Sequence, residues 1–329
     1  MESNVTSRFD LRRVLNAAGP FFGLLLVVGL FSWNPEVRQY FLTGANFKII
    51  FTQTVVVALC ALGMTLIIVS GGIDLSVGSI VALTSVVGAK LLSQNPAWSP
   101  AGAALVVILA GGLMGFVNGA IISGFRMMPF IVTLGMMGIA RGSAKWLSES
   151  QAVNYPESPL NNVMMLENPD HLFPLPTGVW IAIGLAVFMV VVLRQTIFGR
   201  HVFAIGSNEA TARLCGIAVQ RQKLLIYTIA GLFFGLAGLM QMSRLTQGDP
   251  TAASGLELDV IAAVVIGGAS LSGGSGSILG TMVGALIMAV LRNGSNQSGW
   301  PTYMQEIIIG GVIIAAVGLD KWRQSRAKS

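Results

Sequence analysis

Residues 71–79, GGIDLSVGS, interrupt a long apolar sequence that runs through residues 55–69 before them and 80–87 after them. Glycine reaches the left-handed conformation that ends a helix without steric cost, so Gly71 and Gly72 are expected to end one helix. Asp74 stands where the next helix should begin, and its carboxylate can accept the free N–H groups of a first helical turn. The stretch predicts a helix, a break, a polar cap and a second helix.

The same pattern recurs 196 positions later as GGASLSGGS, residues 267–275, with six of nine positions identical. The residue that corresponds to Asp74 is Ser270, which is also a good helix cap. Apolar helices interrupted at corresponding places in two halves of a chain indicate a translocation pathway. We therefore predict that the pathway, or the helix breaks beside it, is formed by Gly71, Gly72, Asp74, Ser76, Gly267, Gly268, Ser270 and Ser272.

The composition indicates an integral membrane protein of the all-α class. Of the 329 residues, 53% are hydrophobic and only 10% are charged, whereas a soluble domain carries roughly 25% charged residues. The net charge of +6 raises the possibility of a nucleic-acid partner. The basic residues lie between apolar runs and at the chain ends, so we expect them to orient the chain in the membrane and expect no nucleic-acid binding.

We expect one domain, 1–329, of about ten transmembrane helices that contains both Gly-Gly breaks. The spans are expected near 17–33, 47–70, 75–93, 100–124, 128–147, 177–194, 222–243, 256–269, 277–293 and 302–319. With the N-terminus inside, thirteen of the 20 Lys and Arg residues lie inside and seven outside, which favours two cytoplasmic termini.

The eighth of these helices is short. The nine residues 258–266 span roughly 13 Å at about 1.5 Å per residue, whereas the hydrocarbon core is about 30 Å thick. Segments 256–269 and 277–293 therefore either cross the membrane fully or form a re-entrant hairpin, and both alternatives leave the next segment on the same side.

Small residues recur at intervals of four in several of the expected helices. Gly111, Gly115 and Gly119 share this spacing, as do Gly231 and Gly235. This spacing lets helices approach closely in lipid, so it predicts tight helix packing. The methionine pairs 127–128 and 136–137 are expected to fill the core.

Two loops are long. Residues 148–176 contain five prolines and are expected to form a periplasmic loop, which either meets an external partner or serves as a connector. Residues 195–221 are expected inside, with Ser207 as a helix cap, Glu209 in the first turn and Gly216 at the end of a short helix. Such a helix is too short to persist alone, so it should pack on a protein partner or on the lipid surface.

Several kinds of chemistry have no sequence signature here. The chain has no phosphate-binding G-x-x-x-x-G-K-[ST] motif, so we expect no ATP site, no cofactor and no enzymatic activity of its own. His171 and His201 are far apart in loops, and neither they nor Cys60 and Cys215 have the spacing of a metal site. For Asp74 two roles stay open: a helix cap, or a contact with substrate or gate.

Four segments together resemble a known family. They are GMTLIIVSGGIDLSVGS (63–79), PFIVTLGMMGIARG (129–142), GRHVFAIGSNEATARLCGI (199–217) and LELDVIAAVVIGGASLSGG (256–274). In this order they are similar to the membrane permease subunit of bacterial ABC importers for ribose-type monosaccharides, and the resemblance covers nearly the whole chain.

The resemblance implies a multi-pass protein of the bacterial inner membrane that works with three partners. These are a second permease copy, identical or different, a cytoplasmic ATPase with two nucleotide-binding domains that binds the ATP, and a periplasmic sugar-binding protein. It also implies a helix that couples to the ATPase, formed by Ser207, Asn208, Glu209, Ala210, Arg213, Leu214 and Gly216. Related members carry autoinducer-2 or other small polar solutes, so the substrate itself does not follow.

An ion-coupled secondary transporter of a small polar solute is the alternative, because such proteins also use broken helices. It would need a buried acid or an ion cage, for which Asp74 is the main candidate. A membrane-embedded enzyme is a third class, and the sequence offers it no catalytic constellation.

Overall fold

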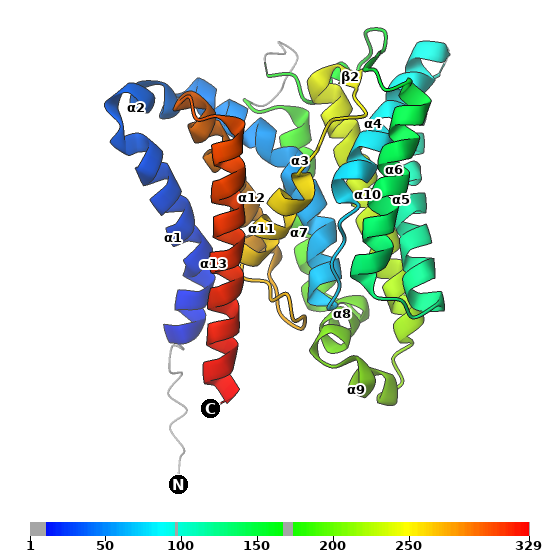
Figure 1. The fold of residues 1–329 in the computed structure, drawn as a ribbon, viewed down its shortest axis with the longest axis vertical. Coiled ribbons are helices and arrows are strands. Elements are labelled where there is room, and N and C mark those ends of the chain that lie inside the picture. Colours follow the sequence, from blue (N-terminus) through cyan, green and yellow to red (C-terminus); the bar gives the residue numbers. More distant parts are fainter. Residues whose placement is uncertain (1–10, 96–97, 167–173, 329) are drawn as a thin grey trace.

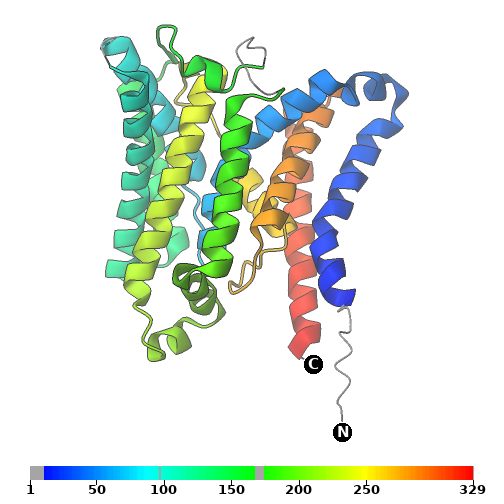
Figure 2. The ribbon, with the colours of Figure 1, turned by 180° about the vertical axis from the view of Figure 1, so that it is seen from behind.

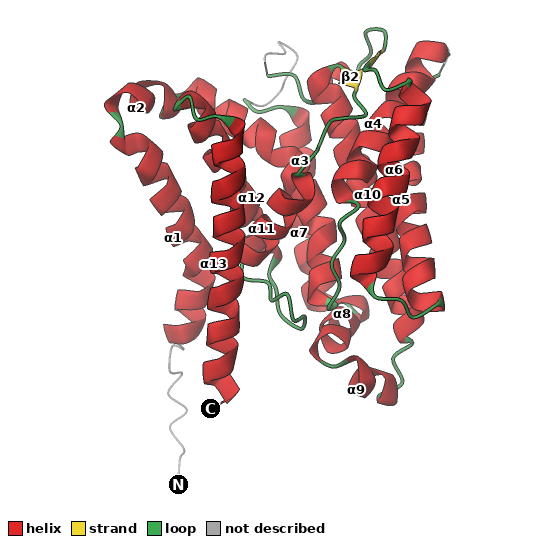
Figure 3. Ribbon diagram, viewed as in Figure 1, coloured by secondary structure: helices red, strands yellow, loops and turns green. Residues whose placement is uncertain are grey.

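A computed structural model describes residues 11–95, 98–166 and 174–328 of the chain. Within these ranges the protein is helical except for one short antiparallel pair, β1 (Val153–Asn154) with β2 (Gln247–Gly248) (Figure 3). The expected loop 148–176 includes residues 167–173, and His171 with them, which lie outside the described residues.

Each of the ten segments predicted to be helical contains a helix. In chain order the helices are α1 (Leu11–Trp33), α2 (Pro35–Phe41), α3 (Gly44–Val69), α4 (Val77–Gln94), α5 (Pro100–Gly124), α6 (Pro129–Ser148), a 3-10 turn η1 (Asn161–Val163), α7 (Thr177–Gln195), α8 (Ile197–Ser207), α9 (Glu209–Leu214), α10 (Val219–Leu245), α11 (Leu256–Ile266), α12 (Ile278–Gln297) and α13 (Thr302–Lys328). Of these, α2, η1 and α8 were not expected from the sequence.

The long helices run between two ends of the molecule (Figures 1 and 2). One end, which we call the α9 end, holds α8, α9, the start of α1 and the end of α13. The opposite end, which we call the β end, holds α2 and the β1–β2 pair. The two long loops of the sequence thus lie at opposite ends of the bundle.

Six helices in the described part of the chain are long and apolar enough to cross a membrane: α3, α4, α5, α7, α10 and α12. The bent pair α1 and α2, which meet at 120°, would make a seventh. Length and composition therefore support an all-α membrane protein, and they do not by themselves single out α6, α11 and α13 as further spans.

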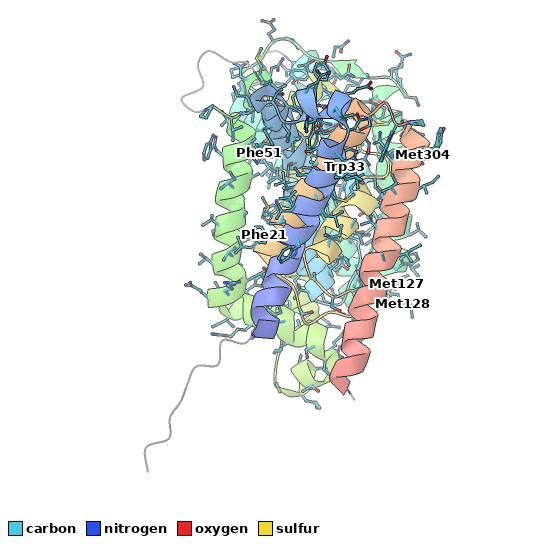
Figure 4. The ribbon with its side chains drawn as sticks, turned by 90° about the vertical axis from the view of Figure 1, so that its left-hand side faces the viewer. Phe21, Trp33, Phe51, Met127, Met128 and Met304 are labelled. Atoms are coloured by element: carbon cyan, nitrogen blue, oxygen red, sulfur yellow. The ribbon has the colours of Figure 1, made fainter. Side chains whose placement is uncertain are left out.

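Helix α3 forms the centre of the bundle. The most apolar window of α3 is 94% buried, whereas that of α7 is 33% buried, so α7 presents most of its surface to the surroundings. Apolar side chains also cover the outer surface of the other peripheral helices, among them Phe21 and Trp33 on the outside of α1 (Figure 4). Burial of an apolar helix inside apolar helices is the arrangement expected in lipid.

The methionines at the start of α6 do not fill the core as expected. Met127 and Met128 are 42% and 71% exposed, because they lie in the turn between α5 and α6 rather than inside a helix (Figure 4). Met136, about two turns further along α6, is buried as predicted.

The tight contact between α5 and α10 depends on glycine. A Cβ atom placed on Gly111 would lie 2.5 Å from both the carbonyl oxygen of Gly231 and the Cα of Gly235. Gly115 is equally tight, since a Cβ there would lie 2.8 Å from the Gly231 Cα. The spacing of four therefore lets two backbones touch, as the sequence predicted.

We expect Gly111→Val to separate α5 from α10, because the new side chain overlaps backbone that cannot move aside. Overpacking of this kind costs about 1–3 kcal/mol, so the unfolding temperature in mild detergent should fall by several degrees. The matched control is Gly138→Val in α6, where a Cβ meets nothing within 4 Å. Equal unfolding temperatures for the two variants would contradict the role of this contact.

Candidate functional site

The first break lies where the sequence predicted it. Gly71 has φ +85°, and its N–H donates to Ile68 O at 2.9 Å, while the Gly72 N–H donates to Ile67 O at 2.9 Å. These bonds satisfy the last carbonyls of α3, which a helix end otherwise leaves unpaired. Gly72 is needed for close approach, since a Cβ there would lie 2.5 Å from Tyr227 Oη in α10.

Asp74 does not cap the first turn of the next helix as expected. It is buried three residues before α4 begins at Val77, and its Oδ1 accepts the N–H and the hydroxyl of Ser76 at 2.7 and 2.5 Å. The extended stretch between α3 and α4 places the carboxylate too early in the chain to reach the first-turn N–H groups. Asp74 instead closes a tight turn at Ser76.

Two further helices complete the first break. Asn118 of α5 donates to Ser76 Oγ at 3.1 Å and to Asp74 Oδ2 at 3.4 Å. The hydroxyl of Thr133 in α6 accepts the Leu75 N–H at 3.2 Å and donates to Ile73 O at 3.3 Å. The non-helical backbone is thus satisfied inside the bundle, a requirement wherever such backbone lies at membrane depth. The sequence analysis missed both residues, whose only signal is a polar side chain within an apolar helix.

In the second break it is the second glycine of the pair, not the first, that has the left-handed conformation. Gly268, not Gly267, has the positive φ (+92°), and the N–H groups of Gly268 and Ala269 donate to Val265 O and Val264 O at 2.9 and 3.1 Å. Gly267 remains helical, and it must be glycine because a Cβ there would lie 2.5 Å from the backbone of Gly280 in α12. The helix end is therefore shifted by one residue relative to the sequence repeat.

Ser270 repeats the local role of Asp74 rather than capping the next helix. Its Oγ accepts the Ser272 N–H at 3.2 Å, as Asp74 Oδ1 accepts the Ser76 N–H. Helix α12 begins only at Ile278 and is capped by Ser277, so the expectation that Ser270 caps it is wrong. The second break is longer because the chain must reach the α9 end before α12 can start (Figure 1).

The two breaks meet at one point, which we call the glycine junction and define as Gly71, Gly206, Gly273 and Gly274 with Val69. The Gly274 N–H donates to Val69 O at 2.9 Å, so the second break binds the end of α3 directly. Gly206 of α8 lies between them: a Cβ there would overlap Val69 O and lie 2.6 Å from Gly274 N. The sequence analysis treated the breaks and the loop 195–221 as separate features, and the structure brings them together.

Helix α9 follows α8 after one residue. Asn208, not Ser207, is its cap, since Asn208 Oδ1 accepts the Thr211 N–H at 2.9 Å and Ser207 is the last residue of α8. The difference arises because α8 was not expected, so its final residue was taken for the start of α9. Gly216 follows α9 with φ +85° and donates to Arg213 O at 3.1 Å, as predicted.

Charged contacts hold α9 against α10. Glu209 accepts from Lys223 Nζ at 2.7 Å and from Arg213 Nη2 at 3.1 Å. The hydrogen bond from Lys223 and the two positive charges hold the pKa of Glu209 below its ordinary value. A lowered folded pKa contributes stability above the unfolded pKa, and that contribution is lost only as the pH falls through the lowered value. At neutral pH Glu209 therefore stays charged and keeps both contacts, while Leu214 is 89% exposed and Ala210 lies beside it on the surface.

The described residues include no group of three or more His, Cys, Asp or Glu side chains that could hold a metal ion. The site as described consists of two interrupted helices that are joined at their breaks and contact α8 at the α9 end.

These features define a multi-pass helical membrane permease. Residues 46–317 match the family described as "Branched-chain amino acid transport system / permease component", and the chain belongs to this family.

Several curated relatives are similar to the chain over nearly its full length. The ribose import permease protein RbsC of Escherichia coli (strain K12) is 41% identical over 303 residues, which are 92% of each chain. The protein of that name in Bacillus subtilis (strain 168) is 38% identical over 95% of each chain. The D-allose transport system permease protein AlsC of Escherichia coli is 34% identical over 97% of this chain and 96% of its own length. No solved structure matches the chain.

We expect Asp74→Ala to destabilise the protein by about 1–3 kcal/mol, because the buried donors of Ser76 and Asn118 lose their acceptor. Asp74→Ser should lose less and keep much of the transport, since Ser270 makes the equivalent bond in the second break. Thermal unfolding in detergent and uptake at matched expression measure the two effects.

The matched control for this prediction is Asp249→Ala. Asp249 Oδ1 also accepts the N–H and the hydroxyl of the residue two positions later, Thr251, both at 2.7 Å. These bonds lie at the surface, where water can replace the lost carboxylate as acceptor. If Asp74→Ser and Asp74→Ala abolish uptake equally at normal protein levels, the carboxylate itself contacts the substrate or the gate.

Proposed function

We propose that this permease is the transmembrane subunit of a bacterial inner-membrane ABC transporter that imports a ribose-type monosaccharide or a similar small polar solute. The observation that carries the proposal is the 41% identity to a ribose import permease along 92% of both chains. The allose permease among the relatives supports a sugar as the solute class.

The proposed complex contains a separate ATPase with two nucleotide-binding domains, a periplasmic sugar-binding protein and a second permease copy, identical or different. ATP binds to the ATPase, and this chain carries no cofactor and no hydrolytic site. Membrane lipid surrounds the outer helices, whose exposed side chains include Leu113 and Val187, each 61% exposed.

For the membrane arrangement we propose about ten spans with both termini in the cytoplasm. The path of the chain supports this, since the described chain starts and finishes at the α9 end (Figure 1). The α9 end would then be cytoplasmic, and the β end, with loop 148–176, periplasmic. Helix α11 and the second break together reach from the upper part of the bundle to α8 at the α9 end, which favours a crossing over a shallow hairpin.

We propose that α9 is the coupling element and that α8 passes its movement to the breaks. Ser207, Asn208, Glu209, Ala210, Arg213, Leu214 and Gly216 form this region, in which the exposed Leu214 is suited to a groove on a soluble partner. Gly206, near the end of α8, lies against Val69 and Gly274. A displacement of α9 by ATP-driven closure of the ATPase therefore acts on both interrupted helices at once. A transition of this kind moves packed elements between two arrangements.

Within this mechanism the breaks themselves are the moving parts. Gly71, Gly72, Asp74 and Ser76 lie between α3 and α4, and Gly267, Gly268, Ser270 and Ser272 lie between α11 and α12. The alternative, an ion-coupled secondary transporter, has weaker support because the Asp74 carboxylate already accepts from Ser76 twice and from Asn118.

The division of labour between subunits leads to a first test. The purified chain should hydrolyse no ATP, and ATP-dependent uptake of D-ribose into proteoliposomes should appear only when the ATPase and the loaded binding protein are added. Robust ATP hydrolysis by the chain alone, surviving stringent purification, would contradict the proposal. Uptake driven by an ion gradient without ATP would favour the secondary transporter.

A second test concerns the coupling helix. Leu214→Glu places a charge where an apolar contact is proposed, so ATPase binding should weaken at least tenfold, or about 1.4 kcal/mol, while membrane insertion is unchanged. The matched control is Leu42→Glu, an exposed leucine near α2 at the opposite end. Co-purification of the ATPase and ribose-stimulated hydrolysis are measured for both. A Leu214→Glu variant that retains its ATPase and transports at the wild-type rate would place the docking surface elsewhere.

A further inference from the structure

Two adjoining cavities lead from the β end into the bundle. The outer cavity, about 930 Å³, lies between the start of α3, residues 157–166 and the end of α10. The deeper cavity, about 350 Å³, lies among α3, α10, α11 and α12. Gln53 and Arg244 line both, so the two cavities are adjacent.

The deeper cavity is polar although it lies among apolar helices. Its polar lining comprises Gln53, Gln241, Arg244, Ser254, Asp259, Arg292 and Asn296. Its volume is at the lower end of the range of about 300–1,000 Å³ that small-molecule sites occupy. Polar residues facing a cavity inside a membrane bundle are costly unless they serve a ligand or an aqueous path.

The charges of the two cavities balance. Arg244 and Arg292 are the cations among the described lining residues, and Glu157 and Asp259 are the anions. Glu157 lines only the outer cavity, so the deeper cavity holds two cations and one anion. Charges of both signs with several amide side chains suit a ligand that has many hydroxyl groups.

Asp259 provides an independent sign of a ligand. Its side chain is 3% exposed, and both Nε and Nη2 of Arg292 bind the same oxygen, Oδ2, at 2.7 and 2.6 Å. The other oxygen, Oδ1, is buried and has no hydrogen-bond donor among the described residues. A buried carboxylate oxygen without a donor is unfavourable, so a third group is needed to complete the pair.

The cavity lies next to the first break. Leu256 at the start of α11 lines it, and a Cβ on Gly78 of α4 would lie 3.5 Å from Leu256 Cβ and 2.8 Å from Glu257 Oε2. The start of α11 therefore rests on the first turns of α4, directly after the break. A ligand in the cavity would contact the start of α11, which in turn rests on α4.

We propose that the deeper cavity is a relay site for a neutral polyhydroxylated molecule of monosaccharide size. In this site Asp259 Oδ1 accepts a ligand hydroxyl, and the guanidinium groups of Arg244 and Arg292 donate to ligand oxygens. The proposal rests on the proposed function, since it gives the incoming sugar a first binding site on this chain.

Uptake of radiolabelled D-ribose in the reconstituted complex tests the site. Asp259→Asn keeps the shape of the side chain but removes the charge, and we expect at least a tenfold loss of uptake. The matched control, Arg38→Gln, changes an exposed charge at the same end and should leave uptake within twofold of the wild type. If the wild-type complex imports no ribose, the proposed function is wrong. If the wild-type complex imports ribose and the Asp259→Asn complex imports it at the same rate, only the proposed relay site is wrong.

A double variant separates ligand binding from a purely structural ion pair. Asp259→Asn with Arg292→Gln leaves no unpaired charge, so it should restore uptake if the single variant fails only because Arg292 loses its counter-charge. The relay site predicts that uptake stays low although the double variant folds, as judged by its unfolding temperature. Recovery of uptake would overturn the proposal.

Thiol protection tests binding without relying on uptake. Ser254→Cys, in a background with the exposed Cys215 changed to Ser, places a thiol at the exposed edge of the deeper cavity. We expect saturating D-ribose to slow its reaction with a membrane-impermeant thiol reagent at least threefold, and ribose 5-phosphate to have less effect. Glu36→Cys at the same end should react equally with and without ribose. Equal rates for Ser254→Cys with and without ribose, in a complex that imports ribose, would refute the site.

Discussion

The structure depends on one constraint: backbone that is not helical must find its hydrogen bonds inside a bundle that excludes water. The chain meets this constraint at the first break with Gly71, the Asp74 carboxylate and the Thr133 hydroxyl. At the second break, the Gly274 N–H finds its acceptor on the other interrupted helix, at Val69 O. Each break thus completes the other, which explains why they lie side by side although about 200 residues separate them.

Much of the fold follows from local pattern. The apolar runs predicted ten helices at nearly the right places, the Gly-Gly pair predicted the end of α3, and the glycine spacing predicted tight helix packing, which the structure shows between α5 and α10. These features depend on residues close together in the chain. The start of α9 was misplaced by one residue because α8, which has few charges and no clear boundary signal, was taken for loop.

The site could be predicted only in part, because its partners come from distant elements. The sequence alone does not indicate that Asn118 of α5 contacts Ser76, or that Gly206 of α8 packs between Val69 and Gly274. Asp259 is held in the interior by Arg292, which lies 33 residues later in the chain. Such pairs depend on tertiary packing, and a polar residue inside an apolar helix is the one signal that could have found them.

The short length of α11 has a consequence for how the protein is made. Eleven residues span about 16 Å, roughly half the bilayer core, so α11 is a poor signal for membrane insertion on its own. A lone aspartate at membrane depth adds about 2.5–3.5 kcal/mol against insertion. Arg292 neutralises that aspartate, and it arrives with α12. We therefore expect the translocation machinery to release α11 and α12 into the bilayer as one unit, after α3 and α10 are in place to receive them.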